Sequence, residues 1–291
     1  MESALENASS KTQLSASQRS ALISLLADED AAIYRAIRET LLAYGLDAIA
    51  WLRPYASHVD PTLRRRAQEI VQHLLKQEID DRFLAFCLNH GEDLDVETGA
   101  WFVAQTRYPD INVPAYQALL DEFAGELRER LEGVLGIERT LATVTNYLFT
   151  DLHFAGNETQ YYDPDNSYLN RVIDRRMGNP ITLCLIYLLI TKRLRLPVVG
   201  IGMPGHFLCR YQTPTGEAFI DAFNRGKLLN KSECIKYLLQ SGHGYLEGYL
   251  APVSPRRMLL RMCANLHQIY VDVEQPKEAA QLQRYIVALS K

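Results

Sequence analysis

The chain has 291 residues, of which 47% are hydrophobic, and this is enough to build a large core and two or three compact units. Its 31 basic and 35 acidic residues are well mixed and give a formal net charge of −4. Nucleic-acid-binding proteins usually carry a basic face or tract, so we expect no nucleic-acid partner. The densest apolar stretch, residues 181–190, is only half as long as the roughly 20 residues of a membrane span, so we expect no membrane association.

The cysteines predict the cellular compartment. They are odd in number, form no CxxC pair and show no metal-binding spacing with histidine. Free thiols of this kind are typical of a reducing compartment, and the N-terminal residues lack the apolar stretch of a signal peptide. We therefore expect a cytoplasmic protein with no metal site and no other cofactor. The five positions are Cys87, Cys184, Cys209, Cys234 and Cys263.

The N-terminal half of the chain has a helical pattern. Residues 1–17 are rich in Ser, Asn and Glu, which predicts a disordered tail, and residues 18–149 show apolar residues at helical spacing. Two stretches that begin at Asp30 and Asp60 are similar to a pair of HEAT-like helical repeats. An ordinary helical domain explains the same pattern, so both interpretations remain open. Further helices are expected at 96–106, 112–132 and 137–149.

Residues 150–249 mix helical and strand-like segments and predict an α+β core. A short helix is expected from Tyr168 to Arg176; Gly178 ends it, Asn179 can cap the next helix, and Pro180 takes that helix's first position. The second helix, over 180–194, is apolar almost all round and therefore belongs at the centre of a domain. Strands are expected at 198–202, 206–211 and 218–223.

Residues 250–291 predict a helical hairpin that is broken at Gln275 and Pro276. The pair is similar to half of a tetratricopeptide array. A single pair cannot form a solenoid, so we expect it to dock on the rest of the chain. Its two apolar stripes are Leu259, Met262, Leu266 and Tyr270, and Ala279, Leu282, Ile286 and Leu289.

The strand-like segments carry a histidine and an aspartate that can meet. A two-residue hairpin loop places His206 opposite Asp221, and a four-residue loop places Asp221 opposite Leu208, one diagonal step from His206 on the same face. Cysteine-nucleophile acyl transfer uses a thiol at a helix N-terminus, a histidine base and a carboxylate that orients the histidine. A core histidine and a turn-capping aspartate explain the same two residues without catalysis.

A family resemblance rests on one dense run over residues 154–211, which begins FAGNETQYYDPDNS and ends MPGHFLCRY, and on the run FIDAFNRGKLL that follows it at 219–229. Residues 95–245 resemble the SirB-type branch of the transglutaminase-like superfamily, which often carries a C-terminal helical pair. The resemblance implies a papain-like α+β core in which His206 and Asp221 match the second and third members of the superfamily triad.

The nucleophile position departs from the active enzymes. These enzymes place a Gly-x-Cys at the helix start, and counting back from Leu196 and Pro197 puts Pro180 at the cysteine position. The SirB-type branch commonly lacks this cysteine. Cys184 lies about 6 Å further along the helix axis in an apolar setting, so it is a poor candidate nucleophile and a good candidate core residue.

The function expected from these features is a non-catalytic transglutaminase-like protein that acts as a peptide-binding, protein-binding or regulatory module. We expect its groove to be lined by Asn166, Asn179, Pro180 and Gly205. The alternative is an active cysteine-protease-like amidohydrolase or acyl transferase that uses the His206–Asp221 pair. A third reading is a regulatory scaffold whose core is merely structural. The sequence carries no signal for an oligomeric state.

Overall fold

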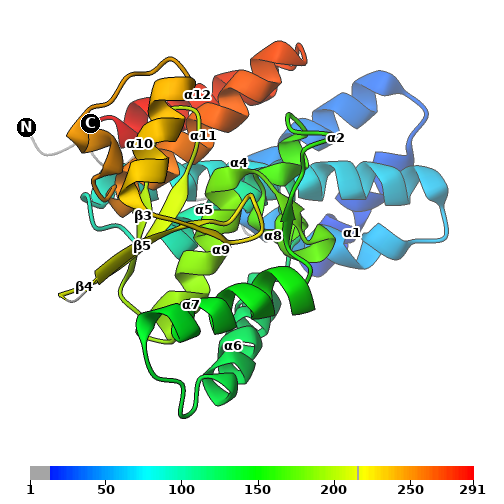
Figure 1. The fold of residues 1–291 in the computed structure, drawn as a ribbon. Helices are drawn as coiled ribbons and strands as arrows, with labels where there is room; N and C mark the ends of the chain where they lie inside the picture. The colour runs from blue at the N-terminus through cyan, green and yellow to red at the C-terminus, as the bar shows by residue number, and fades with distance from the viewer. Residues whose placement is uncertain (1–13, 215) are drawn as a thin grey trace, which may run out of the picture. The chain divides into compact units, whose positions relative to one another are not determined.

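The computed structural model describes residues 14–214 and 216–291 and divides the chain into two compact units, one ending at Asp81 and one beginning at Arg82 (Figure 1). Most of the predicted N-terminal tail, residues 1–13, lies outside the described residues. Its last two residues are not a tail, because helix α1 begins at Ala16. The side chains of Ser15 and Gln18 form a capping box there, which satisfies two amides of the first turn.

The first unit is helical. It contains α1 (Ala16–Ser24), α2 (Ala31–Tyr44), α3 (Leu46–Leu52) and the first part of α4 (Pro61–Asn89), with 3₁₀ turns at Leu25–Ala27 and Arg53–Ser57. The two stretches expected to begin helices do so: Asp30 caps α2, and the Asp60 carboxylate accepts a hydrogen bond from the Thr62 amide at the start of α4. The core of the unit is formed by fully buried side chains such as Leu26, Leu41, Leu52 and Ala67.

The second unit combines helices with two small sheets, which confirms a mixed α+β architecture. The N-terminal helices that belong to it are α5 (Val96–Arg107), α6 (Val113–Arg130) and α7 (Ile137–Thr145), and a π-helical turn extends α7 over Asn146–Asp151. The later helices are α8 (Leu169–Arg175), α9 (Pro180–Arg193), α10 (Lys231–Gln240), α11 (Pro255–Asp272) and α12 (Pro276–Leu289). Helix α10 has no counterpart among the predicted elements.

The larger sheet is antiparallel, with the order β3 (Val198–Ile201), β4 (Leu208–Thr213), β5 (Gly216–Asp221) and β6 (Lys227–Leu229). A parallel pair, β1 (Ala155–Gly156) and β2 (Met177–Gly178), lies beside the start of α9. Strand β4 pairs with β5 so that Cys209 faces Ile220, and one further step places Leu208 opposite Asp221. This is the register of the longer predicted loop.

The position of His206 is a correction to the predicted strand 206–211. Strand β4 begins at Leu208, and His206 lies in the preceding turn, where its amide donates to the carbonyl of Met203. Gly205 has φ +71°, a left-handed conformation that glycine adopts without steric cost. The turn thus carries His206 to the end of the sheet, and one residue, Phe207, separates it from the start of β4.

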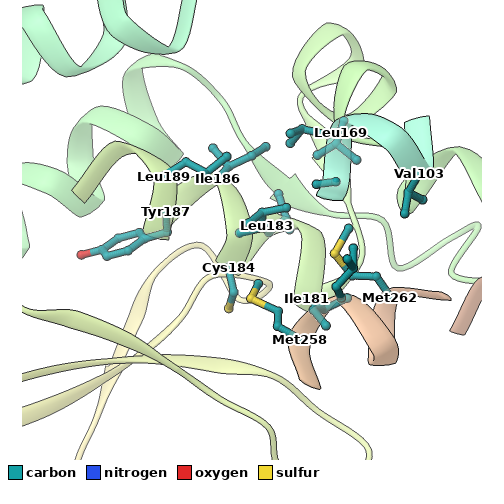
Figure 2. Close-up of a cluster of buried hydrophobic side chains, with 14 of the residues drawn as sticks. Val103, Leu169, Ile181, Leu183, Cys184, Ile186, Tyr187, Leu189, Met258 and Met262 are labelled. Atoms are coloured by element: carbon teal, nitrogen blue, oxygen red, sulfur yellow. The ribbon is translucent and has the colours of Figure 1, made fainter. Parts of the chain in front are cut away.

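Helix α9 is the centre of the second unit. It contacts helices α6, α8 and α11 and strands β3 and β4, which explains why nearly all its side chains are apolar and buried. Figure 2 shows this packing: Leu183 and Ile186 point toward α5 and α8, and Ile181 and Cys184 point toward Met258 of α11.

Alternation along the strands builds two layers of core on either side of the sheet. Cys209, Tyr211 and Ile220 belong to the cluster around α9, whereas Leu208 and Phe219 belong to a smaller cluster with Cys234 and Leu238 of α10. The sheet therefore lies between α9 and α10.

The predicted boundaries at 149 and 249 do not coincide with the two compact units. Helices α5, α6, α11 and α12 share one hydrophobic cluster with α9 and one face of the sheet. The physical reason is the apolar character of α9: a helix without a polar face needs neighbours on every side, and the flanking helices supply them.

Candidate functional site

His206 and Asp221 face each other at the end of the sheet. The Nε2 atom of His206 lies 2.9 Å from Oδ2 of Asp221, and the two residues are 9% and 5% exposed. The distance is in the range of a hydrogen bond, although the ring N–H is not in line with the oxygen. Since Nε2 faces the carboxylate, Nδ1 is the ring nitrogen left for a ligand, and it has no hydrogen-bond partner within the described part of the chain.

The carboxylate of Asp221 is held by two neighbours. Its oxygens also accept hydrogen bonds from the backbone amide of Asn224, at 3.2 Å, and from the side-chain amide of Asn224, at 2.7 Å. Burial by itself raises the pKa of Asp221, but the imidazole of His206 and the Asn224 donors outweigh burial and hold the pKa of this carboxyl below its usual value. Asp221 therefore caps the turn after β5 and orients His206 at the same time.

Aromatic and backbone contacts fix the ring of His206. The ring of Phe223 stands edge-on to it, with centroids 6.3 Å apart, and the ring of Tyr237 lies 5.6 Å away. The guanidinium of Arg261 donates to the backbone carbonyl of His206 at 2.8 Å. Phe223 is itself held by Gly156, whose amide donates to the Phe223 carbonyl.

His206 lines a pocket of about 360 Å³ in the second unit, a volume typical of a small ligand site. The walls come from four segments: the loop before α8, the start of α9, the turn before β4 and one face of α11. The lining residues are Tyr161, Tyr162, Asn179, Pro180, Ile181, Gly205, His206, Phe207, Arg261, Asn265, Gln268 and Ile269.

The start of α9 is built as the sequence predicts. Asn179 is the N-cap, and its side-chain oxygen accepts hydrogen bonds from the amide and the hydroxyl of Thr182, each at 3.0 Å. Its side-chain NH₂ donates to the hydroxyl of Ser167 at 2.8 Å, which ties the cap to the preceding loop. Pro180 takes the first helical position, where a missing amide costs nothing. The positive end of the helix dipole thus borders the pocket.

The pocket lining contains neither cysteine nor serine nor threonine. Cys184 is fully buried, and its thiol donates to the backbone carbonyl of Phe207 at 3.4 Å, which directs it toward the sheet (Figure 2). Cys209 is also buried and donates to the carbonyl of Cys184. Thr182 is fully buried, and its hydroxyl donates a hydrogen bond to the side-chain oxygen of Asn179. The hydroxyls of the lining belong to Tyr161 and Tyr162 alone.

Three of the four residues expected in the groove line the pocket: Asn179, Pro180 and Gly205. Asn166 does not. It is fully buried, its NH₂ donates to the carbonyls of Gln160 and Tyr161, and its oxygen accepts from Asn157. Asn166 therefore shapes the loop that carries Tyr161 without reaching the ligand space.

Sequence reasoning missed the contribution of α11. Arg261, Asn265 and Gln268 recur at helical spacing and share one face of that helix. Their spacing was visible in the sequence, but it predicts a shared face only; the docking of α11 beside α9 determines that this face meets His206.

The described residues contain neither a metal-binding cluster nor a membrane-spanning helix. No group of three or more His, Cys, Asp or Glu side chains is arranged to hold a metal ion in residues 14–214 and 216–291. Within the same ranges, no helix combines the length and the apolar character that crossing a bilayer requires.

Comparison with known proteins identifies the fold family. The model of the transglutaminase-like superfamily matches residues 114–264. A UPF0162 protein of Xylella fastidiosa is 34% identical over 208 residues, which cover 68% of this chain and 73% of the relative. Human F-box only protein 21 is 28% identical over 235 residues, which cover 70% of this chain and 37% of that protein.

A more distant relative is the UPF0162 protein YchA of Escherichia coli, 26% identical over 106 residues that cover 36% of this chain and 39% of that protein. No solved structure shows significant similarity. The region matched by the family model contains the start of α9, the His206–Asp221 pair and Arg261, whereas the other pocket residues of α11 lie beyond its end at residue 264. The chain therefore belongs to the transglutaminase-like superfamily.

Proposed function

We propose that this protein is a non-catalytic member of the superfamily, of the SirB-type branch, that binds a peptide or an exposed protein segment in the pocket beside His206. One observation carries the proposal. The His206–Asp221 pair and the start of α9 meet at a pocket, but no thiol or aliphatic hydroxyl lines it. Such a site retains the electrostatics of acyl transfer and lacks the atom that forms the covalent intermediate.

The position of the missing nucleophile supports this reading. Pro180 occupies the helix start that carries the cysteine in the active enzymes, and its ring has no nucleophilic atom. Replacement by Cys184 requires the thiol to leave the Phe207 carbonyl and move from a fully buried position. Cys184 lies four residues beyond Pro180, about 6 Å along the helix axis. This distance exceeds by far the ~0.5 Å within which catalytic groups must be placed.

The composition of the walls supports a peptide ligand. Pro180, Ile181, Phe207 and Ile269 are apolar, and Asn265 and Gln268 offer amide groups that can pair with a peptide backbone. The helical elements outside the site, expected from the sequence to be HEAT-like and tetratricopeptide-like, would add surface for the protein that carries the peptide. All five cysteines are free and buried, which supports the proposed cytoplasmic location.

The test is peptide binding with a matched steric block. A positional-scanning library of acetylated hexapeptides is screened against the fluorescently labelled protein, and the best peptide is titrated. Asn265→Trp fills the pocket from the exposed face of α11, whereas Ala264→Trp adds the same side chain at the neighbouring exposed position outside the lining. We expect Asn265→Trp to abolish binding and Ala264→Trp to preserve it. Binding that both variants retain would place the ligand elsewhere.

The alternative function is amide hydrolysis or acyl transfer with water or an unexpected group as the nucleophile. The ionised Asp221 beside His206 favours it, because this pair can act as a general base. Its test is product release from the same peptides, followed by mass spectrometry for wild type and His206→Ala. Turnover that His206→Ala removes would overturn the non-catalytic proposal, and the absence of turnover together with binding would support it.

A further inference from the structure

Arg261 holds a positive charge at the wall of the pocket. It lies half-buried on α11, and its Nη2 donates to the carbonyl of His206. The centre of the guanidinium lies 5.6 Å from the centroid of the Phe207 ring. These contacts use one of the five N–H donors of the group, and the remaining donors find no acceptor within the part of the chain that the structure describes.

No carboxylate neutralises this charge. Within the described residues, no Asp or Glu oxygen lies within ion-pair distance of Arg261, and burial lowers the pKa of its guanidinium. Two other half-buried arginines of the same unit have acidic partners: Arg193 meets Glu97 at 2.9 Å, and Arg171 meets Asp165 at 2.9 Å. Arg176 forms no ion pair within the described residues, but it lies over two aromatic rings and does not line this pocket. An unpaired, partly desolvated guanidinium is costly unless a ligand supplies the counter-charge.

The other residues that line the pocket bring no negative charge to it. The lining contains no Asp or Glu. The N-terminus of α9 presents the positive end of its dipole, and the carboxylate of Asp221 is not part of the lining, since it lies 2.9 Å from Nε2 of His206. The amides of Asn265 and Gln268, one and two turns along α11, add neutral donors on the same face.

We infer that Arg261 forms the carboxylate subsite of this pocket and that the ligand is an acidic peptide whose carboxylate pairs with the guanidinium. The inference rests on the proposed peptide-binding function and specifies the chemistry of the peptide. A carboxylate fits better than a phosphate, because a phosphate dianion is usually met by a cluster of arginines and this pocket has one permanent charge. The apolar walls accommodate the aliphatic part of the acidic residue.

The carboxylate has two possible sources, a Glu or Asp side chain and the C-terminus of a peptide. Four probes separate them: acetyl-AAEAA-amide, its glutamine counterpart acetyl-AAQAA-amide, acetyl-AAAAA with a free carboxylate, and acetyl-AAAAA-amide. Binding is measured by calorimetry on the full chain at two salt concentrations, with inorganic phosphate as a competitor.

The variants isolate the charge from the fold. Arg261→Gln removes the positive charge, and Arg261→Lys keeps the charge but lacks the paired N–H donors of the planar guanidinium. Arg257→Gln is the control, because it removes an exposed arginine one turn earlier on α11. We expect wild type to bind at least one carboxylate probe about tenfold or more tightly than its amide counterpart. In Arg261→Gln, the carboxylate probe and its amide counterpart should bind with equal affinity. Arg261→Lys should keep part of the preference for the carboxylate probe, and Arg257→Gln should keep all of it.

The results separate this inference from the proposed function. If the neutral and acidic probes bind equally and Asn265→Trp blocks both, the pocket binds peptides as proposed, but Arg261 is not a carboxylate subsite. If no probe binds and no hexapeptide binds, both proposals fail. A preference that Arg261→Gln leaves intact, or stronger binding of inorganic phosphate, would also overturn the subsite.

Discussion

Nη2 of Arg261 donates a hydrogen bond to the backbone carbonyl of His206 at 2.8 Å. This bond joins the C-terminal helical pair to the turn that carries the imidazole, although the two residues are far apart in the chain. It makes α11 a wall of the site, and the pocket beside His206 depends on the docking of this helix.

The Asp221–His206 pair predicts a pH-dependent stability. Because the pKa of Asp221 is lowered in the folded state, the ionised carboxylate stabilises the fold above the unfolded-state pKa of about 3.9, and this contribution disappears as the pH falls through the folded-state pKa. Asp221→Asn should therefore lower the melting temperature at neutral pH, and its difference from wild type should shrink in the acid range. Differential scanning calorimetry across this range measures both.

The matched control for that experiment is Asp93→Asn, which makes the same atomic change at an exposed aspartate. Its melting curve should follow wild type at every pH. A gap between Asp221→Asn and wild type that stays constant into the acid range would show that the carboxylate charge does not stabilise the fold.

The buried thiols predict slow chemical labelling. All five cysteines are buried, and burial raises the pKa of Cys87 and of Cys234 to about 12, so few thiolates are present at neutral pH. Ellman's reagent should react slowly with the native protein and promptly after unfolding in urea. One thiol that reacts fast in the native state and is lost in Cys184→Ala would revive this residue as a nucleophile.

Position 156 must be a glycine, because Phe223 packs directly against its backbone. A Cβ at this position would lie 2.6 Å from the Phe223 ring and 2.7 Å from the Phe223 carbonyl oxygen. Gly156→Ala should destabilise the fold by about 1–3 kcal/mol and weaken peptide binding, since Phe223 packs edge-on against His206. Chemical denaturation gives the free energy of unfolding.

The control is Gly125→Ala in α6, where a new Cβ meets no atom. Because alanine favours a helix over glycine, it should stabilise the protein by about 0.5–1 kcal/mol. Equal effects of the two substitutions would contradict the close packing of Gly156 against Phe223.

The cap of α9 predicts a large effect from a small substitution. Asn179→Ala removes the hydrogen bonds to Thr182 and to Ser167, and it should cost about 1–2 kcal/mol of the free energy of unfolding. Asn112→Ala removes the exposed cap of α6 and should cost less, since water can replace that bond. A smaller loss for Asn179→Ala than for Asn112→Ala would contradict the role of the buried cap.

Local signals in the sequence predicted much of the site. Asn179 and Pro180 are the cap and first residue of α9, and the hairpin register brings Asp221 beside His206. These features depend on neighbouring residues, on backbone preferences and on the two-residue period of strands. The apolar sequence of α9 also placed that helix at the centre of its domain.

Tertiary structure decided the rest. Asn166 faces the interior of its loop, His206 lies before β4 and outside it, and helices expected in three separate regions share one core. The charge of the pocket comes from Arg261, whose helix reaches the site only by packing against α9. Sequence periodicity identifies which residues share a face of a helix, whereas the partner of that face depends on contacts between segments distant in the chain.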